Sequence, residues 1–398
     1  MKAECGMRNA EWKTVTLGSV FDIARGGSPR PIDKFITDDP NGVNWIMISD
    51  ATSKYITSTK KRIIKEGMKK SREVHPGDFL LTNSMSFGRP YIMQTSGCIH
   101  DGWLVMSPRG GVAHPDYFYH LLGSDVLYAE FERRAAGATV KNLNIDLVKG
   151  VEVLLPPMVE QRRIAEVLDR AEALRVKRRA ALAQLNTLTQ SLFLDLFGDP
   201  ANNPKGWPSI QLGDVVFSAS DGPHVSPDYV ESGIPFLSTR HVRPGGMSWE
   251  DLKFISPEEA QIHWRKCKPE RGDILYTKGG TTGIAKVVDW DKPVAIWVHI
   301  ALLKTDKSKV EPLWLEAMLN APFCYQQSQR LTRGIANRDL GLTRMVTIKM
   351  YLPPISLQRE FARRVTAVEA LKTAQRASLA ELDALFATLQ HQAFKGEL

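Results

Sequence analysis

Two stretches of the chain carry the spacing of hydrophobic residues that is typical of a long amphipathic helix. Each begins with Leu-Pro-Pro, at Leu155 and Leu352, and continues without another proline or an internal glycine. Proline at the start and none within favours a helix that begins there. Apolar residues recur at helical steps, which predicts a coiled-coil stripe. The stripe positions are Ile164, Leu168, Ala171, Leu174, Leu182, Leu185, Leu188, Leu192 and Leu196 in the first helix, and Phe361, Val365, Val368, Leu371, Leu379, Leu382, Leu385, Leu389 and Ala393 in the second.

Polar residues interrupt both stripes at equivalent places. The breaks are Arg175, Arg178, Lys372 and Gln375. The cations among them would repel one another unless carboxylates such as Glu172 and Glu369 intervene. We therefore expect the part of both helices around these four residues, which we call the waist, to be partly exposed.

The segments outside the helices read as globules of mixed structure. They combine short β-branched and aromatic runs with turns rich in Gly, Pro, Ser and Asn. Such runs are typical of strands joined by loops. The clearest strand candidates are residues 44–48 and 293–298, and the clearest helix candidates are residues 117–122 and 314–319.

The second half of the chain repeats the first. Leu17-Gly18-Ser19-Val20, which we expect to be a strand, returns as Leu212-Gly213-Asp214-Val215 after an equivalently placed tryptophan. The Gly-Asp-hydrophobic-Leu run at Gly77 returns at Gly272, and Leu-Pro-Pro is followed in both copies by Gln-Arg. A single repetition of this length indicates a tandem duplication and not a solenoid.

These patterns divide the chain into four parts: residues 1–155 and 199–352 are globules, and residues 156–198 and 353–398 are helices. Gly198 and Pro200 end the first helix and lead into the second globule. The simplest way to bury the two stripes is to pack them on each other. The predicted fold class is α+β, with two tandem-repeated globules separated by two long helices packed as an antiparallel coiled coil with pseudo-twofold symmetry.

Three pairs of loops recur in register in the two globules but carry different polar side chains. The first pair is residues 25–30 and 218–224, the second is 82–89 and 277–283, and the third is 137–142 and 334–338. Small residues allow close approach of the backbone to DNA, and Arg, Lys, Ser, Asn and His can donate to phosphates or base edges. Arg30 and Arg240 are candidates for base-edge contacts, and Lys141 for a phosphate contact. The full set of candidate DNA-binding residues is Arg25, Ser28, Arg30, Ser84, Arg89, Lys141, Asn142, Ser220, His224, Arg240, His241, Lys278, Thr281, Thr282, Asn337 and Arg338.

Composition agrees with a DNA-binding role without requiring it. Lys and Arg outnumber Asp and Glu by 52 to 44, giving a net charge of +8, so a polyanionic partner is plausible. The length of 398 residues suggests more than one domain. We expect no membrane span, no export signal and a cytoplasmic protein. Cys5, Cys98, Cys267 and Cys324 are far apart, which is typical of reduced thiols.

Catalytic signatures are scarce. The chain has no Gly-x4-Gly-Lys-Ser/Thr phosphate-binding loop and no Asn/Asp-Pro-Pro-Tyr/Phe motif of an amino-methyltransferase. His263 and Cys267 could supply two metal ligands, but no second pair is near them in sequence. We therefore predict no active site and no metal site.

The duplicated order of motifs resembles the specificity (S) subunit of type I restriction-modification enzymes. The resemblance covers essentially the whole chain, from the Trp-x4-Leu-Gly-x-Val openings to Leu-Pro-Pro-x3-Gln-Arg and Leu-Phe-Gly-Asp-Pro. It implies that the globules are target recognition domains for double-stranded DNA, each reading half of a bipartite site. It also implies docking of two methyltransferase (M) subunits, which use S-adenosylmethionine, and of restriction/translocase (R) subunits, which use ATP and Mg. No cofactor is expected on this chain.

Two alternatives share parts of this pattern. The recognition subunit of a type II system that cuts on both sides of its site has the same architecture. A two-headed coiled-coil adaptor that binds only protein would also show two globules and two helices.

Overall fold

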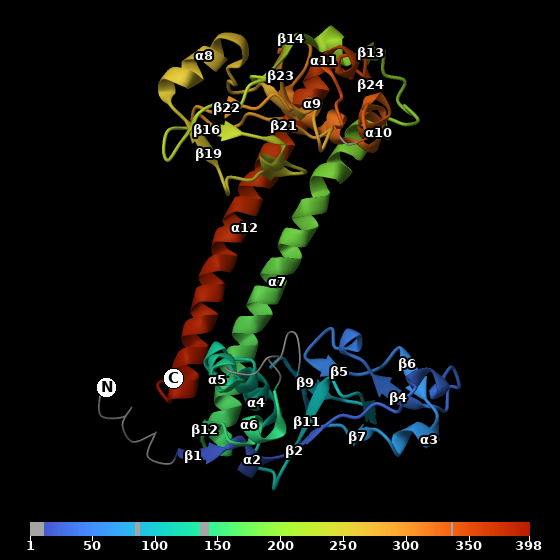
Figure 1. The fold of residues 1–398 in the computed structure, drawn as a ribbon, viewed down its shortest axis with the longest axis vertical. Coiled ribbons are helices and arrows are strands. Elements are labelled where there is room, and N and C mark those ends of the chain that lie inside the picture. Colours follow the sequence, from blue (N-terminus) through green and yellow to red (C-terminus); the bar gives the residue numbers. More distant parts are fainter. Residues whose placement is uncertain (1–11, 84–87, 136–142, 336) are drawn as a thin grey trace. The chain divides into compact units, whose positions relative to one another are not determined.

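The computed structural model describes residues 12–83, 88–135, 143–335 and 337–398. The chain divides into two compact units, one within Met1–Arg179 together with Ala377–Leu398, and the other formed by Ala180–Arg376. Each unit holds one globular domain and part of both long helices, α7 (Met158–Phe197) and α12 (Ile355–Lys395) (Figure 1). Both helices begin directly after their Pro-Pro pairs. None of the helices in the described ranges combines the length and apolar character that a membrane span requires.

The first domain is built on a five-stranded sheet. Its strands in spatial order are β2 (Phe21–Arg25), β11 (Trp103–Pro108), β8 (Phe79–Thr82), β9 (Pro90–Met93) and β5 (Tyr55–Ile56). The central strand β8 is buried along its whole length, which explains its unbroken apolar run. Phe21 packs edge-on against Phe79 and Phe118 in the core beneath this sheet.

A second five-stranded sheet extends the first domain. Its strands in spatial order are β3 (Ile36–Thr37), β6 (Lys61–Ile63), β4 (Val43–Ile46), β10 (Gly97–Ile99) and β7 (Arg72–Val74). The turns η2 (Ile32–Lys34) and η3 (Ile48–Asp50) and the short helix α3 (Lys65–Met68) connect them. β4 and β10 are parallel, with Trp45 opposite Cys98. Trp45, Ile63 and Cys98 form a small core of their own.

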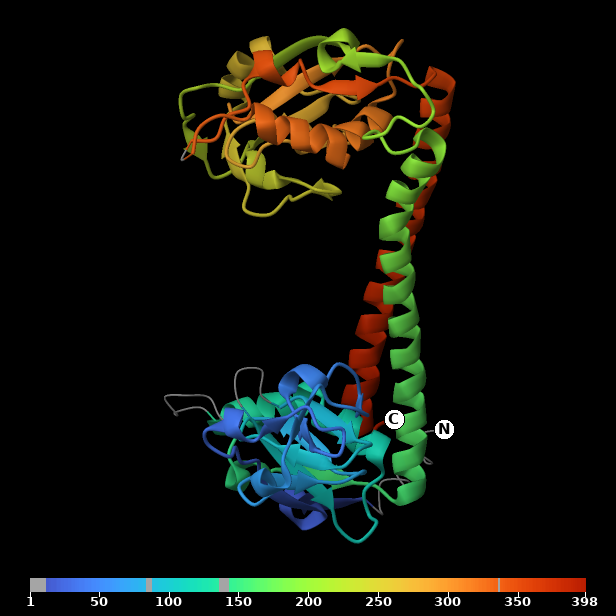
Figure 2. The same cartoon turned by 90° about the vertical axis from the view of Figure 1, so that its right-hand side faces the viewer.

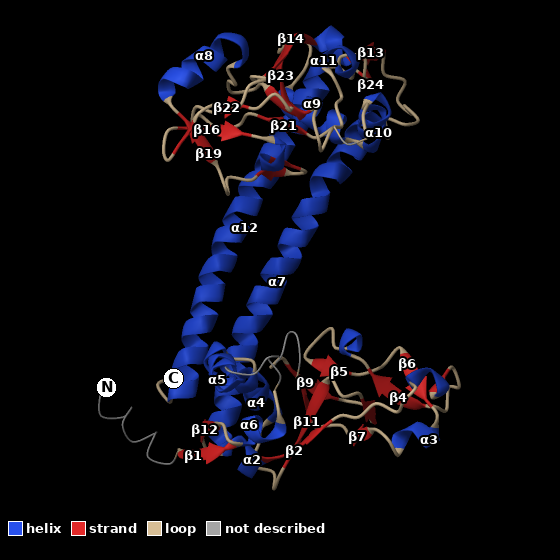
Figure 3. Cartoon of the chain, in the orientation of Figure 1, coloured by secondary structure: helices blue, strands red, loops and turns tan. Residues whose placement is uncertain are grey.

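The second domain repeats this plan with fewer strands (Figure 3). Its larger sheet has the order β14 (Val216–Asp221), β23 (Ile300–Thr305), β20 (Ile274–Thr277) and β21 (Ala285–Val287). Its smaller sheet has the order β15 (Tyr229–Val230), β19 (Lys253–Ile255), β16 (Ile234–Leu237) and β22 (Ala295–Ile296). β17 (Val242–Arg243) and β18 (Gly246–Met247) form a separate hairpin, and η5 (Thr239–His241) precedes it. Phe236 and Ala295 face each other on parallel strands, as Trp45 and Cys98 do.

Short helices complete each domain. In the first they are α4 (Pro115–Leu122), α5 (Asp125–Ala135) and α6 (Ile145–Lys149), and in the second α8 (Pro257–Cys267), α9 (Pro312–Asn320), α10 (Pro322–Leu331) and α11 (Leu342–Met345). The helices expected at residues 117–122 and 314–319 are confirmed as α4 and α9. Cys98, Cys267 and Cys324 are free and buried.

The glutamine of the repeated Gln-Arg motif attaches each long helix to its domain. Gln161 accepts a hydrogen bond from the His114 backbone N–H (2.8 Å) and donates to the carbonyl of Pro156 (2.9 Å). Gln358 likewise accepts from the Glu311 N–H (2.9 Å) and donates to the carbonyl of Pro353 (2.8 Å). Both glutamines are almost fully buried, so these bonds satisfy backbone groups that water cannot reach.

Both long helices contribute to the core of the first unit. Ile164 and Leu168 of α7 share this core with Phe386 and Phe394 of α12. Figures 1 and 2 show this end of α12 (red) beside the start of α7 (green). Asp169 of α7 also accepts hydrogen bonds from Lys54 (3.0 Å) and His120 (2.8 Å). Arg175 pairs with Glu172 and with Asp383 (2.6 Å).

The second unit has the corresponding arrangement. Phe193 and Phe197 of α7 pack against Phe361 of α12, with ring centroids 5.8 and 5.5 Å apart. Lys372 forms an ion pair with Glu369 (2.6 Å). The carboxylates expected to offset the cations of the waist are thus in place within each unit. Several stripe positions remain exposed, however: Leu174, Leu188, Leu371 and Leu385.

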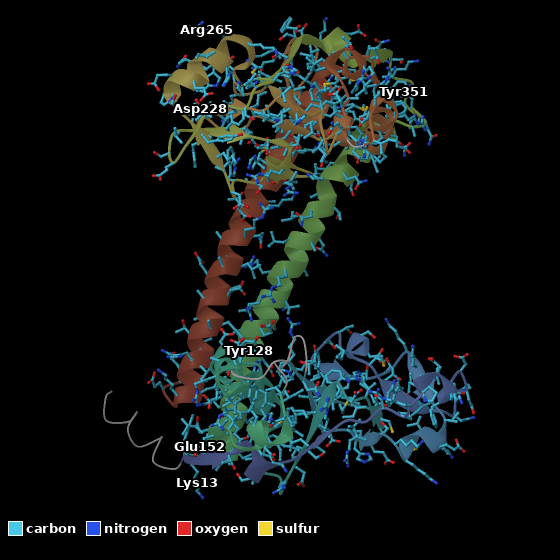
Figure 4. All side chains as sticks on the ribbon, in the orientation of Figure 1. Lys13, Tyr128, Glu152, Asp228, Arg265 and Tyr351 are labelled. Carbon is cyan, nitrogen blue, oxygen red and sulfur yellow. The ribbon has the colours of Figure 1, made fainter. Side chains whose placement is uncertain are left out.

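Some of the expected strands are wrong. Residues Leu17–Val20 form the helical turn α2, and Leu212–Val215 form the turn η4, because the two apolar residues of each motif are spaced to point to the same side and are both buried. The actual opening strands are β1 (Lys13–Thr16), paired with β12 (Glu152–Leu155), and β13 (Ser209–Gln211), paired with β24 (Lys349–Tyr351). Figure 4 labels Lys13, Glu152 and Tyr351 on these strands. The runs at 44–48 and 293–298 are strand only in part, because β4 ends at Ile46 and β22 covers only Ala295–Ile296.

Candidate DNA interface

The first loop of each domain passes very close to the backbone of another segment of the same domain. A Cβ atom on Gly26 would lie 2.0 Å from the carbonyl oxygen of His100, and one on Gly222 would lie 1.9 Å from that of Ile296. Both separations are impossible for a side chain, so only glycine permits this close approach. This explains why the two copies keep glycine at this position while the residues after it differ.

A second feature common to both domains joins the remaining two loops. The backbone N–H of Leu143 donates to the carbonyl of Asn83 (3.0 Å), and the N–H of Leu340 donates to the carbonyl of Lys278 (2.7 Å). Asn83 and Lys278 occupy equivalent positions after β8 and β20. These two backbone features therefore recur in the described parts of both loop clusters, while the side chains around them differ.

In the first domain the cluster is organised by Asp101. Its carboxylate accepts a hydrogen bond from the Ser28 hydroxyl (2.7 Å) and lies 3.6 Å from the Arg30 guanidinium. Its backbone carbonyl accepts from Arg25 Nε (3.1 Å) and Asn83 Nδ2 (2.7 Å). The bond from Ser28, helped by the nearby charge of Arg30, lowers the pKa of Asp101. The acid thus stays ionised and fixes the first loop.

In the second domain a cation occupies the centre. The Lys278 ammonium lies 3.2 Å from Asp221 of the first loop and 3.4 Å from Asp339, which follows the third loop, and it donates to the carbonyl of Val298 (3.2 Å). Asp221 also pairs with Lys266 (2.6 Å) and lies 3.7 Å from His224. Burial alone would raise the pKa of Asp221, but the hydrogen bonds from Lys266 and Lys278 outweigh it and the pKa is lowered.

The candidate residues fall into three groups. Those at the surface are Arg25, Ser28, Arg30, Arg89, Ser220, His224, Arg240, Thr281, Asn337 and Arg338, of which Ser28 and Ser220 are half-buried. Those that are buried are His241, Lys278 and Thr282. Ser84, Lys141 and Asn142 lie outside the described residues.

The buried candidates are held by partners inside the second domain. Thr282 Oγ1 lies 3.0 Å from Thr332 Oγ1, and the His241 ring accepts from the Ser238 N–H (2.8 Å). Of the exposed ones, Arg338 donates to Gln329 (2.6 Å). In this structure Lys278 and Thr282 support the loop cluster from within instead of presenting a donor to solvent.

Sequence reasoning missed the acids that form hydrogen bonds and ion pairs within each cluster. Asp101, Asp221 and Asp339 are not among the candidate DNA-binding residues. Their role depends on partners far away in sequence, which no local motif reveals. Asp221 lies in the first loop of the second domain. Of the three acids, it is the one that the charge of the loop residues could have pointed to.

The family model for the type I restriction modification DNA specificity domain matches this chain twice, at residues 9–186 and 204–383. The chain belongs to the type I specificity subunit family. Each copy of the family domain contains one globule, one loop cluster and most of one long helix. The chain is thus a DNA specificity subunit with two tandem recognition domains.

Individual relatives are similar along nearly the whole chain. The type I restriction enzyme MjaVIII specificity subunit of Methanocaldococcus jannaschii is 20% identical over 92% of this chain and 88% of its own length. The EcoBI specificity subunit of Escherichia coli is 22% identical over 97% of this chain and 86% of its own.

Solved structures share the fold of this specificity subunit. A chain from a study of complex assembly and conformational transition in a type I R-M system has a TM-score of 0.64 at 20% identity, covering 98% of this chain and 99% of that one. The S subunit from M. genitalium has a TM-score of 0.58 at 16% identity, covering 96% of both chains. At such identities the likeness concerns the fold alone.

Proposed function

We propose that each recognition domain reads one half of a bipartite, asymmetric DNA site. The observation that carries this is the duplicated loop cluster: one backbone frame, held by equivalent glycines and an equivalent loop-to-loop hydrogen bond, bears an acid-centred set of side chains in one domain and a lysine-centred set in the other. Two related frames with different polar side chains suit two different base sequences.

We further propose that α7 and α12 pair antiparallel, relate the domains by a pseudo-twofold axis and set the spacer between the half-sites. Contacts within each unit support the direction. Arg163, early in α7, donates to the carbonyl of Leu398 (2.8 Å), and Arg175 meets Asp383. Phe197, at the end of α7, meets Phe361 near the start of α12. Residues further along α7 therefore contact residues earlier in α12.

The exposed apolar residues of the helices support docking of two M subunits there. Leu174 on α7 is 52% exposed, and Leu371 and Leu385 on α12 are 52% and 50% exposed. Large exposed side chains of this kind mark interaction surfaces when they gather along one element. R subunits would join the assembled complex afterwards.

In this proposal the chain has no catalytic activity and binds no cofactor. S-adenosylmethionine belongs to the M subunits, and ATP and Mg to the R subunits. The purified chain should neither methylate nor cut DNA until an M subunit and S-adenosylmethionine are added. Turnover that follows this chain through further purification would contradict this part of the proposal.

The decisive experiment exchanges residues 12–155 for the same domain of another family member and sequences the methylated bases of a host carrying the system. One half of the bipartite site should change and the other half should remain. A matched exchange of residues 207–352 should change the opposite half. Changes in both halves after either exchange would refute independent reading. No sequence-dependent methylation with any partner set would favour the protein-binding adaptor.

The type II alternative differs in its partners and not in its reading of DNA. Copurification with separate methyltransferase and translocase chains would support the type I assembly. Copurification with a single chain carrying both nuclease and methyltransferase activity would support the type II form.

A further inference from the structure

A hollow of about 710 Å³ opens beside the first loop of the first domain. Trp45, Met47 and His100 line one part of it, and the loop residues 28–33 line the rest. All of these belong to the first unit. The proposed reading function does not by itself assign any role to this hollow.

His100, one of the residues that line the hollow, carries a buried ring nitrogen without a partner among the described residues. Its Nδ1 accepts a hydrogen bond from the backbone N–H of Gly102 (2.9 Å), so in the neutral ring the proton must be on Nε2. Burial lowers the pKa of His100, which keeps the ring neutral. Nε2 is buried and has no hydrogen-bond partner within the described residues. A buried donor without an acceptor is unfavourable, and such a group points to a ligand that supplies one.

The position of the His100 ring is built into the backbone. A Cβ atom on Gly102 would lie 2.5 Å from His100 Cε1, so glycine is required for the ring to lie where it does. Nδ1 also lies 4.0 Å from the Asp101 carboxylate, the centre of the loop cluster. The hollow and the loop cluster are therefore adjacent parts of one surface.

The walls of the hollow suit a flat aromatic ligand attached to an anionic chain. The Trp45 ring lies 6.2 Å from the His100 ring, and Met47 and Pro29 add apolar surface. The side chain of Arg30 also lines the hollow and is 81% exposed, so its cation is available at the edge. Aromatic and apolar walls, one N–H donor and an edge cation match a nucleobase and its phosphate.

An equivalent hollow of about 230 Å³ is present in the second domain. The strand register equates Trp45 with Phe236, because each faces the parallel strand at the same level. Phe236 and Trp297 form its aromatic wall, with ring centroids 5.6 Å apart. Lys253, which lies 4.2 Å from the Tyr229 ring, supplies a cation. The hollow recurs in the fold, but its donors and size differ, as expected of a position that distinguishes bases.

We propose that the hollow of the first domain is a nucleobase-reading site in which His100 Nε2–H donates to an acceptor atom on one base of the first half-site. Met47 lies beside the edge of that base, and Arg30 holds the neighbouring phosphate. This assignment rests on the proposed reading of a bipartite site by the two domains.

The test compares two substitutions of His100 in the complete complex with its M subunits. His100→Asn retains an acceptor for the Gly102 N–H but removes the Nε2 donor, whereas His100→Gln places an amide donor near Nε2. Binding is measured by competition with duplexes in which each base pair of both half-sites is changed in turn. Equal thermal unfolding midpoints of the three proteins control for folding.

For His100→Asn we expect discrimination at one base pair of the first half-site to fall about tenfold or more, the size expected for the loss of one base-edge contact. His100→Gln should retain most of the discrimination at that base pair. A duplex whose base lacks the acceptor atom, such as a 7-deazapurine, should lower the affinity of the unaltered complex and have little further effect on the asparagine variant.

Unchanged discrimination in His100→Asn would overturn the assignment. Equal weakening for every sequence would mean that the group contacts phosphate, and loss of M-subunit binding would mean that the hollow docks protein; both outcomes also overturn it. Failure of the proposed function is distinct, because the unaltered complex would then show no sequence discrimination at all.

Discussion

Replacement of Lys278 by methionine tests whether the lysine-centred cluster holds the loops of the second domain. The side chains of Lys278 and Asp221 are only 8% and 7% exposed, so their ion pair is almost fully buried. Removing one partner of a buried pair typically costs about 3–5 kcal/mol, because the other charge is left without compensation. Asp221 keeps Lys266 at 2.6 Å, which places the expected loss near the lower end, at about 3 kcal/mol.

Hydrogen exchange followed by mass spectrometry can locate this loss within the full-length chain. Amides of β14 and of the segment around Asp339 should exchange roughly 100-fold faster in Lys278→Met, which corresponds to about 3 kcal/mol of local stability. Amides of the first domain should be unaffected. Lys349→Met removes the same charge from an exposed position on β24 and serves as the control.

The pH dependence gives a second readout of the same variant. The pKa of Asp221 in the folded chain is below its ordinary value of 3.8, so its contribution to stability is present above that pH and is lost as the pH falls through the folded pKa. Without the hydrogen bond from Lys278, the effect of burial on the Asp221 carboxyl is less well offset, so the pKa of Asp221 should rise. Acid unfolding of the second domain should therefore begin at a higher pH in the variant. A stability loss below about 1 kcal/mol and an unshifted acid transition would refute the central role of Lys278.

Three further predictions concern other parts of the chain. Gly222→Ala should destabilise the second domain and leave the first intact in calorimetry, because the new Cβ would collide with a strand carbonyl; retention of both transitions would contradict the close approach. Burial raises the pKa of Cys267 to about 11 and that of Cys324 to about 12, so neither thiol should react with iodoacetamide near pH 7 until the chain is denatured, as mass spectrometry can check. Inserting helical residues near Arg178 or Gln375 lengthens the helix by about 1.5 Å per residue. The spacer of the methylated site should therefore become longer, and neither half-site should change.

The duplication, the long helices and the family follow from the amino-acid sequence alone. These features depend on local information: proline placement, helical spacing of apolar residues and motifs repeated in the same order. The starts of α7 and α12 directly after Pro-Pro, and the helices α4 and α9, follow from it. Where local information was ambiguous, the prediction was wrong. The two apolar residues of Leu17–Val20 fit a helical turn better than the expected strand.

Which loop residues face solvent, and which hold the loops together, depends on how distant segments pack in the folded chain. Lys278 was selected as a DNA contact from its place in a glycine-rich loop, yet it is buried between Asp221 and Asp339, which are distant from it in sequence. His100 carried no sequence signal, because its free donor is defined by a backbone bond from Gly102 and by the walls around it. Burial and the pairing of charges arise when distant segments meet, and a pattern along the chain does not contain that information.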